Sequence, residues 1–209
     1  MSYDPSDAAW DDAYERMSQE LYPEHKAQAI IEFTYVRLRS YYVANKELLV
    51  PAVSTFKRSK ELLELKQPQA ALVFAVSTIE LFLKACLLRP VVAGLVHSET
   101  LAELVVDASL AQTGYKRYER LLAGLFRELL SSEIGALKRV DSQKPLLEEA
   151  SALQDQRNAI IHRGTDVTQE QAAHAYEVAI AVFNLVLGPV LSELGLAVEK
   201  GGRLIDRVA

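Results

Sequence analysis

Apolar residues recur at intervals of three and four along most of the chain, the spacing that places them on one face of an α-helix. Within residues 69–89, the stripe contains Leu72, Val76, Ile79 and Leu83. The spacing predicts four long helices, at residues 25–45, 69–89, 144–163 and 169–190. It also predicts shorter helices near residues 51–66, 99–111 and 115–139.

Residues that favour helix starts stand where several of these helices should begin. Pro51, Pro68 and Pro145 lie near expected starts, where a missing N–H does no harm. Thr168 followed by Gln171 is a capping-box pattern at the start of the last long helix. No run alternates with period two, as a half-buried strand would. The chain is therefore predicted to be all-α, an up-and-down bundle of four core helices plus accessory helices.

The two ends of the chain differ in composition from its centre. Residues 1–24 hold seven acidic residues and the single base Arg16, a net charge of −6. Because the whole chain has a net charge of −5, residues 25–209 are near +1. The C-terminal end contains the pair Gly201-Gly202. We expect an acidic arm at residues 1–24, a helical domain at 25–194 and a loosely held tail at 195–209. The small basic clusters of the domain neither support nor exclude a polyanionic partner.

Composition also bears on the compartment. The longest apolar region, residues 178–191, is interrupted by Asn184 and by Gly188-Pro189, and it falls short of the roughly 18 apolar residues of a membrane span. The acidic N-terminus does not resemble a secretory signal. The single cysteine, Cys86, cannot form an internal disulfide, and a reducing compartment is the default. These features predict a cytoplasmic protein without a membrane segment.

Most familiar catalytic and ligand-binding patterns are absent from the sequence. No histidine stands at ligand spacing from cysteines or carboxylates, as a zinc site would require, and no Gly-rich phosphate loop or nucleophile elbow occurs. His174, near the start of the last helix, is expected to be an exposed polar residue. We therefore predict no metal site and no cofactor.

One short stretch, QDQRNAIIHRG at residues 154–164, combines polar groups in an unusual place. The stripe of its helix puts Arg157 among apolar positions, where a guanidinium must be paired or face a polar cleft. Asn158 and His162 are i, i+4 neighbours on the adjacent face. Arg157 and His162 are about 140° apart around the helix and roughly 7.5 Å apart along it. One copy of the helix therefore does not bring these two side chains directly together.

Two interpretations of this group are open. In the structural one, Arg157 pairs with Glu80 from the helix STIELFLKACL, with Lys84 one turn further on, and His162 is favoured at the helix end by the dipole. In the functional one, Arg157, Asn158 and His162 are catalytic groups.

The motif R-N-A-I-I-H resembles the R-x-x-x-x-H signature of the HEPN superfamily. STIELFLKACL at residues 77–87 is similar to an earlier HEPN helix, and VTQEQAAHAYEVAIAVF to the C-terminal one, so the resemblance covers roughly residues 45–190. It implies a helical bundle that dimerises and brings two motifs together. It also implies Arg157 and His162 as the catalytic pair, Asn158 as their polar companion, and Glu80 and Lys84 as supporting residues.

Many HEPN proteins are metal-independent endoribonucleases of toxin–antitoxin or other defence systems. The residue types suit that chemistry, because RNA supplies its own 2′-OH nucleophile, an imidazole can move its proton, and a guanidinium can stabilise the phosphoryl charge. We therefore expect cleavage of single-stranded RNA by a homodimer. The alternative is a non-catalytic helical dimer that binds a nucleotide or a partner protein.

The resemblance also bears on regulation. Members controlled by a nucleotidyltransferase often carry a tyrosine two residues after the histidine, and here that position is Gly164. Regulation through that tyrosine is therefore not available. Any antitoxin or nucleotidyltransferase partner is expected to be a separate protein. The sequence does not identify the RNA target.

Overall fold

The computed structural model describes residues 32–95 and 119–207, together with residues 15–17, 25, 28, 100, 101 and 104. Within these residues the chain is helical apart from one short hairpin, which confirms the all-α class. Residues 32–44 form the first long helical stretch. The other elements are α2 (Val50–Glu64), α3 (Pro68–Glu80), η1 (Leu81–Leu88), α4 (Arg89–Leu95), α6 (Glu119–Leu130), η3 (Ile134–Ala136), α7 (Leu146–Arg163), α8 (Gln169–Val182), η4 (Phe183–Leu187), α9 (Gly188–Glu193), β1 (Leu196–Val198) and β2 (Leu204–Asp206).

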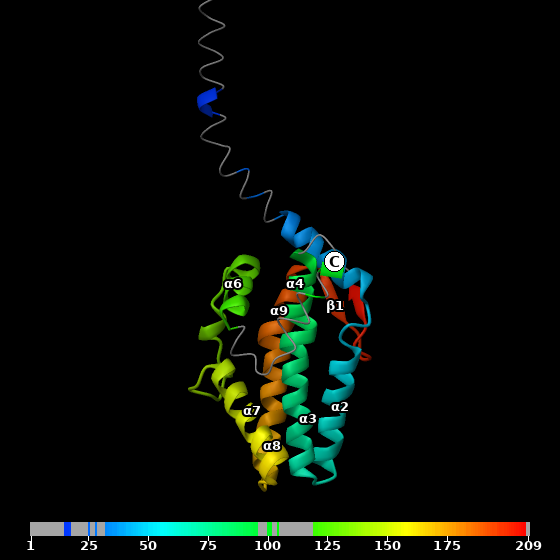
Figure 1. The fold of residues 1–209 in the computed structure, drawn as a ribbon, viewed down its shortest axis with the longest axis vertical. Coiled ribbons are helices and arrows are strands. Elements are labelled where there is room, and N and C mark those ends of the chain that lie inside the picture. Colours follow the sequence, from blue (N-terminus) through cyan, green and yellow to red (C-terminus); the bar gives the residue numbers. More distant parts are fainter. Residues whose placement is uncertain are drawn as a thin grey trace, which may run out of the picture.

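The bundle is built around α3 and α8, which pack extensively on each other. Helix α2 packs against α3 and α8 on one side, and α7 packs against both on the other side (Figure 1). Residues 65–67 join α2 to α3, and residues 164–168 join α7 to α8, so that consecutive helices run in opposite directions (Figure 1). The apolar stripes predicted from the sequence face this shared core, where Leu72, Ile79 and Leu153 are buried.

The predicted start and stop signals act as expected. Pro68 is the first residue of α3, and Pro145 is the N-cap of α7. The Thr168 side chain accepts a hydrogen bond from the Gln171 backbone, and the reciprocal bond completes the capping box of α8. Gly164 ends α7 with φ +64°, a left-handed conformation that costs glycine little.

Two long helices, Pro68–Leu95 and Gln169–Glu193, each change from α to π geometry part of the way along. The π segments η1 and η4 close with i→i+5 bonds, from Arg89 N–H to the Lys84 carbonyl and from Gly188 N–H to the Phe183 carbonyl. A proline, Pro90 or Pro189, follows each π segment by two residues. A proline inside a helix lacks an N–H and clashes with the carbonyl four residues earlier. The wider π turn accommodates it without breaking the helix.

At the first of these prolines a tyrosine supplies the missing hydrogen bond. In a regular helix the Cys86 carbonyl would accept from residue 90, which is proline. The fully buried Tyr42 hydroxyl instead donates to this carbonyl at 2.6 Å. Burial raises the pKa of Tyr42 well above its usual value, so the hydroxyl keeps its proton. Tyr42 thus links residues 32–44 to the centre of the bundle.

The predicted helix at residues 115–139 is wrong in its second half. Helix α6 ends at Leu130, and Ser131 adopts a positive φ of +48°. Residues 137–145 then form an irregular loop that leads into α7. Serine hydroxyls compete for backbone hydrogen bonds, and Ser131-Ser132 therefore ends the helix more readily than the apolar spacing suggests. Residues 1–24 and the predicted helix at 99–111 fall almost entirely outside the described residues.

The C-terminal segment is not the loosely held tail that its glycines suggested. Strands β1 and β2 pair antiparallel, with Ala197 opposite Ile205, and Leu196 and Leu204 are buried. The Leu204 N–H donates to the Lys46 carbonyl at 2.8 Å, which ties the hairpin to the turn before α2. Gly202, at φ +90°, lies so close to Val50 that a Cβ would approach its Cα to 2.9 Å. Gly202 is therefore required for the close approach of the hairpin to α2. The strands were not predicted because three residues are too few to show an alternating apolar pattern.

By length and composition alone, two helices of the described residues could cross a membrane: Pro68–Gly94, with mean hydropathy 2.0, and Gln169–Glu193, with 1.7. Their most apolar windows are 61% and 44% buried inside the bundle. Core helices of bundles show the same pattern, so this is weak evidence for a membrane location. The absence of a membrane segment and the cytoplasmic location stay predictions.

The role of Tyr42 can be tested with a single-atom change. Tyr42→Phe leaves the buried Cys86 carbonyl without the hydroxyl and should lower the free energy of unfolding by about 1–3 kcal/mol, measured by urea denaturation. Tyr41→Phe is the matched control, since no hydrogen bond of its hydroxyl occurs among the described residues. Equal stability of the two variants would show that the Tyr42 bond contributes nothing.

Candidate functional site

The C-terminal half of α7 places Arg157 at the contact between α7 and α3. Its Nη2 lies 3.2 Å from a carboxylate oxygen of Glu80, the last residue of α3, and its Nη1 donates to the Asn158 side-chain oxygen at 2.9 Å. Because the Arg157 and Glu80 side chains are only 25% and 19% exposed, the ion pair is poorly screened by solvent. The ion pair expected from the position of Arg157 on the apolar stripe is therefore present.

Both oxygens of the Glu80 carboxylate accept hydrogen bonds from α7. Its second oxygen accepts a hydrogen bond from the Gln154 amide at 2.7 Å, so that two residues of α7, one turn apart, hold the same carboxylate. The Arg157 Nε is buried and has no hydrogen-bond partner among the described residues. A buried N–H without a hydrogen-bond partner costs free energy. The Nε of Arg157 is therefore an unused donor between α7 and α3.

His162 does not join this cluster. It lies near the end of α7 with an exposed side chain and has no hydrogen bond or ion pair within the described part of the chain. Arg157 faces α3, while His162 faces solvent. The structure thus brings together Arg157, Asn158 and Glu80 and leaves His162 accessible at the same helix end.

Lys84 is half-buried in η1 and forms no ion pair with Glu80 or any other described residue. It lies in the π segment that begins directly after Glu80.

A second polar cluster, which the sequence did not reveal, joins the loop before α7 to α7 and α8. Arg139, only 15% exposed, binds both carboxylate oxygens of the buried Glu149, at 3.0 and 3.2 Å. The same guanidinium contacts Glu177 at 3.1 Å and His174 Nδ1 at 3.2 Å. The Ser142 hydroxyl donates to Glu149 at 2.9 Å. His174 is therefore a half-buried member of a network and not the exposed polar residue expected from its position.

The electrostatics of this cluster favour its charged form. Burial alone raises the pKa of Glu149, but the hydrogen bonds from Arg139 and Ser142 outweigh it, and the pKa of Glu149 is lowered from its ordinary 4.5. The hydrogen bond to Glu149 raises the pKa of Arg139 further. Glu149 lies one residue before the stripe position Ala150, and a carboxylate beside an apolar stripe is the sequence signal that could have indicated a buried partner.

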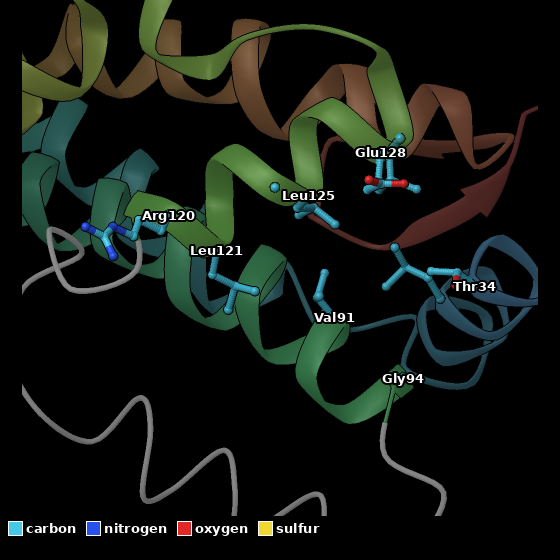
Figure 2. A pocket seen from close by; sticks show the side chains of 10 residues that line it. Thr34, Val91, Gly94, Arg120, Leu121, Leu125 and Glu128 are labelled. Carbon is cyan, nitrogen blue, oxygen red and sulfur yellow. The ribbon is translucent and has the colours of Figure 1, made fainter. Parts of the chain in front are cut away.

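The apolar cavity under α6 offers no comparable chemistry. It has a volume of about 250 Å³ and lies between residues 32–44, α4 and α6. Figure 2 shows Leu121, Leu125 and Val91 lining its interior, with Arg120 and Glu128 at separate ends of the α6 wall. None of the described residues that line it is a histidine, cysteine or serine.

Within the residues that the structure describes, no group of three or more His, Cys, Asp or Glu side chains could hold a metal ion. Comparison with known proteins found no matching family model, no similar curated protein and no similar solved structure. The function is therefore argued from the residues themselves.

The Arg139–Glu149 pair predicts a pH-dependent stability. A carboxyl whose pKa is lowered in the folded state contributes stability above its unfolded pKa, and that contribution is lost as the pH falls through the folded value. Glu149→Gln should therefore cost roughly 3 kcal/mol at pH 7, because it leaves Arg139 without its main partner. The difference from the parent protein should shrink progressively below about pH 4.5.

Urea unfolding at pH 7 and at pH 3.5 measures this effect, and the exposed neighbour Glu148 supplies the control variant Glu148→Gln. A loss for Glu149→Gln that is the same at both pH values, or no larger than that for Glu148→Gln, would contradict this account of the pair.

Proposed function

We propose that the protein is a HEPN-type, metal-independent endoribonuclease that cleaves single-stranded RNA, with Arg157 and His162 as catalytic residues and Asn158 as their polar companion. The observation that carries the proposal is the arrangement at the end of α7. Glu80 and Asn158 hold the Arg157 guanidinium, while the His162 imidazole faces solvent without a partner among the described residues. The R-x-x-x-x-H resemblance gives this arrangement a known chemical use.

The reaction needs one base, one acid and a group that stabilises charge on phosphorus. A neutral imidazole takes the proton of the ribose 2′-OH, and the 2′-oxygen attacks the adjacent phosphorus. The bond from phosphorus to the 5′-oxygen then breaks, and a second imidazole, in its protonated form, gives a proton to that oxygen. The products are a 2′,3′-cyclic phosphate and a 5′-OH end. The N–H groups of Arg157 that Glu80 and Asn158 do not use donate to the phosphoryl oxygens as charge grows on them.

A second copy of the chain completes such a site. One α7 carries a single imidazole, whereas the reaction uses an acid and a base, so two His162 side chains related by a two-fold axis supply both. Ile161, which precedes His162 on α7, is 53% exposed. Covering this apolar side chain favours a homodimer through the end of α7.

The context of the activity follows from the same resemblance. We place the protein in a toxin–antitoxin or defence system of the cytoplasm. Since Gly164 occupies the position of the regulatory tyrosine, a separate antitoxin or nucleotidyltransferase would act by another route, such as covering the α7 face.

A second candidate function is a helical dimer that binds a nucleotide or a partner protein without cleavage. Glu80 already neutralises the Arg157 guanidinium, and both terminal nitrogens of Arg157 have protein partners, an arrangement that an interface network would also use. This candidate predicts that the parent protein dimerises and binds but leaves RNA intact.

The ribonuclease proposal predicts cleavage of single-stranded RNA in the presence of EDTA, with 2′,3′-cyclic phosphate ends. His162→Ala should lower the rate about a hundredfold or more, because it removes the proton-transfer group. Arg157→Lys keeps the positive charge beside Glu80 but loses the fork, and should lower the rate strongly without unfolding the bundle.

Arg163→Ala, an exposed change at the same helix end, and His25→Ala are the matched controls and should cleave like the parent. Calorimetry with nucleotides on the same proteins measures the binding that the second candidate function predicts. Parent-like cleavage by both His162→Ala and Arg157→Lys, or no cleavage by the parent together with binding, would reject the ribonuclease assignment.

A further inference from the structure

An aromatic cavity lies on the opposite side of the bundle from Arg157. It has a volume of about 460 Å³ and is formed by α2, α8, the two π segments and the C-terminal hairpin. Figure 1 shows α2 and α7 on opposite sides of the α3–α8 core, so the cavity is separate from the α7 site. Its volume lies within the range typical of small-molecule sites.

Four aromatic rings line this cavity in two pairs. Phe56 of α2 stacks on Tyr176 of α8, with ring centroids 4.7 Å apart and planes 8° from parallel. Phe82 and Phe183 form the second pair, at 5.5 Å and 50°. A wall of this kind offers flat π surfaces against which a planar ring can pack, with an energy beyond simple apolar burial.

The cavity is also where the two π segments meet. Phe82 belongs to η1, and Phe183 and Asn184 belong to η4, and the two segments are in contact. Short π segments inside α-helices are rare and are frequent at functional sites, because they turn side chains away from the regular helical positions. The prolines that cause the π geometry thus also shape the cavity wall.

Three polar side chains of this cavity are free to bind a ligand. Lys57 and Lys200 are exposed, and neither forms an ion pair or side-chain hydrogen bond among the described residues. The amide of Asn184 likewise has no side-chain hydrogen bond within the described chain. Among the described residues that line the cavity, Glu199 is the only acidic one, so the two lysines leave an excess of positive charge.

We propose that this cavity binds a small planar aromatic ligand that carries an anionic group, with chemistry shared by nucleoside monophosphates and aromatic carboxylates. The ring packs against Tyr176 and Phe183, the Asn184 amide bonds to a polar edge of the ring, and the ammonium groups of Lys57 and Lys200 bind the phosphate or carboxylate. The proposal does not depend on ribonuclease activity, since it uses no residue of the α7 site.

Isothermal titration calorimetry on the full chain tests this proposal with two probes, adenosine 5′-monophosphate and 2-naphthoate. At least one of them should bind with one site per chain. Binding of adenosine 5′-monophosphate alone indicates a nucleoside monophosphate, binding of 2-naphthoate alone indicates an aromatic carboxylate, and binding of both shows that the cavity accepts either anion. Adenosine, which has the ring but no charge, should bind about tenfold or more weakly than adenosine 5′-monophosphate, because it loses the charge-assisted contacts. Inorganic phosphate alone should not bind.

The double variant Lys57→Ala/Lys200→Ala should weaken binding of the charged probe about tenfold or more, and should leave the weak binding of adenosine unchanged. Lys46→Ala/Lys138→Ala removes the same charge at exposed positions outside the cavity and should bind like the parent. Tyr176→Ala should weaken every aromatic probe. Absence of binding by both probes, or equal affinity in the two double-lysine variants, would overturn the proposal.

Discussion

The guanidinium of Arg157 constrains how the bundle is assembled. It cannot lose its proton, yet its side chain is only 25% exposed between α7 and α3, where an unpaired charge would cost several kcal/mol. Glu80 is the residue of α3 that meets it, and Gln154 holds the other oxygen of the same carboxylate. The pair therefore links α7 to the end of α3. His162 lies further along, at the exposed end of α7.

Two prolines give the core its second organising feature. Pro90 and Pro189 each follow a π segment by two residues, in the two longest helices of the described chain. The widened turns keep these helices continuous, leave the Cys86 carbonyl to Tyr42, and bring Phe82 against Phe183. The same deviation from α geometry thus produces a core contact on one side and a cavity wall on the other. The bundle offers two chemically distinct sites, the Arg157–Glu80 pair with the exposed His162 on α7 and an aromatic cavity between α2 and α8.

Features that depend on the residues of one helix alone could be predicted from the sequence. The apolar spacing and the Thr168–Gln171 box predicted α8, and the position of Arg157 on a stripe demanded a partner that proved to be Glu80. Features that depend on two distant segments were missed. Arg139 reaches Glu149, Glu177 and His174 only because a loop folds back over α7 and α8, and no local pattern shows that path. The hairpin was missed because its strands have three residues each and the Gly201-Gly202 pair between them suggested looseness.

In the function that we propose, the end of α7 forms a working site only when two copies of it meet. The RNA cleavage rate per chain tests this, measured without metal across protein concentrations that span the monomer–dimer transition seen by sedimentation velocity. We expect a rate that rises in proportion to the dimer fraction and levels off once all chains are dimeric. The dimeric site would be contradicted if monomer and dimer cleave RNA at the same rate per chain, or if the dimer does not cleave RNA at any protein concentration.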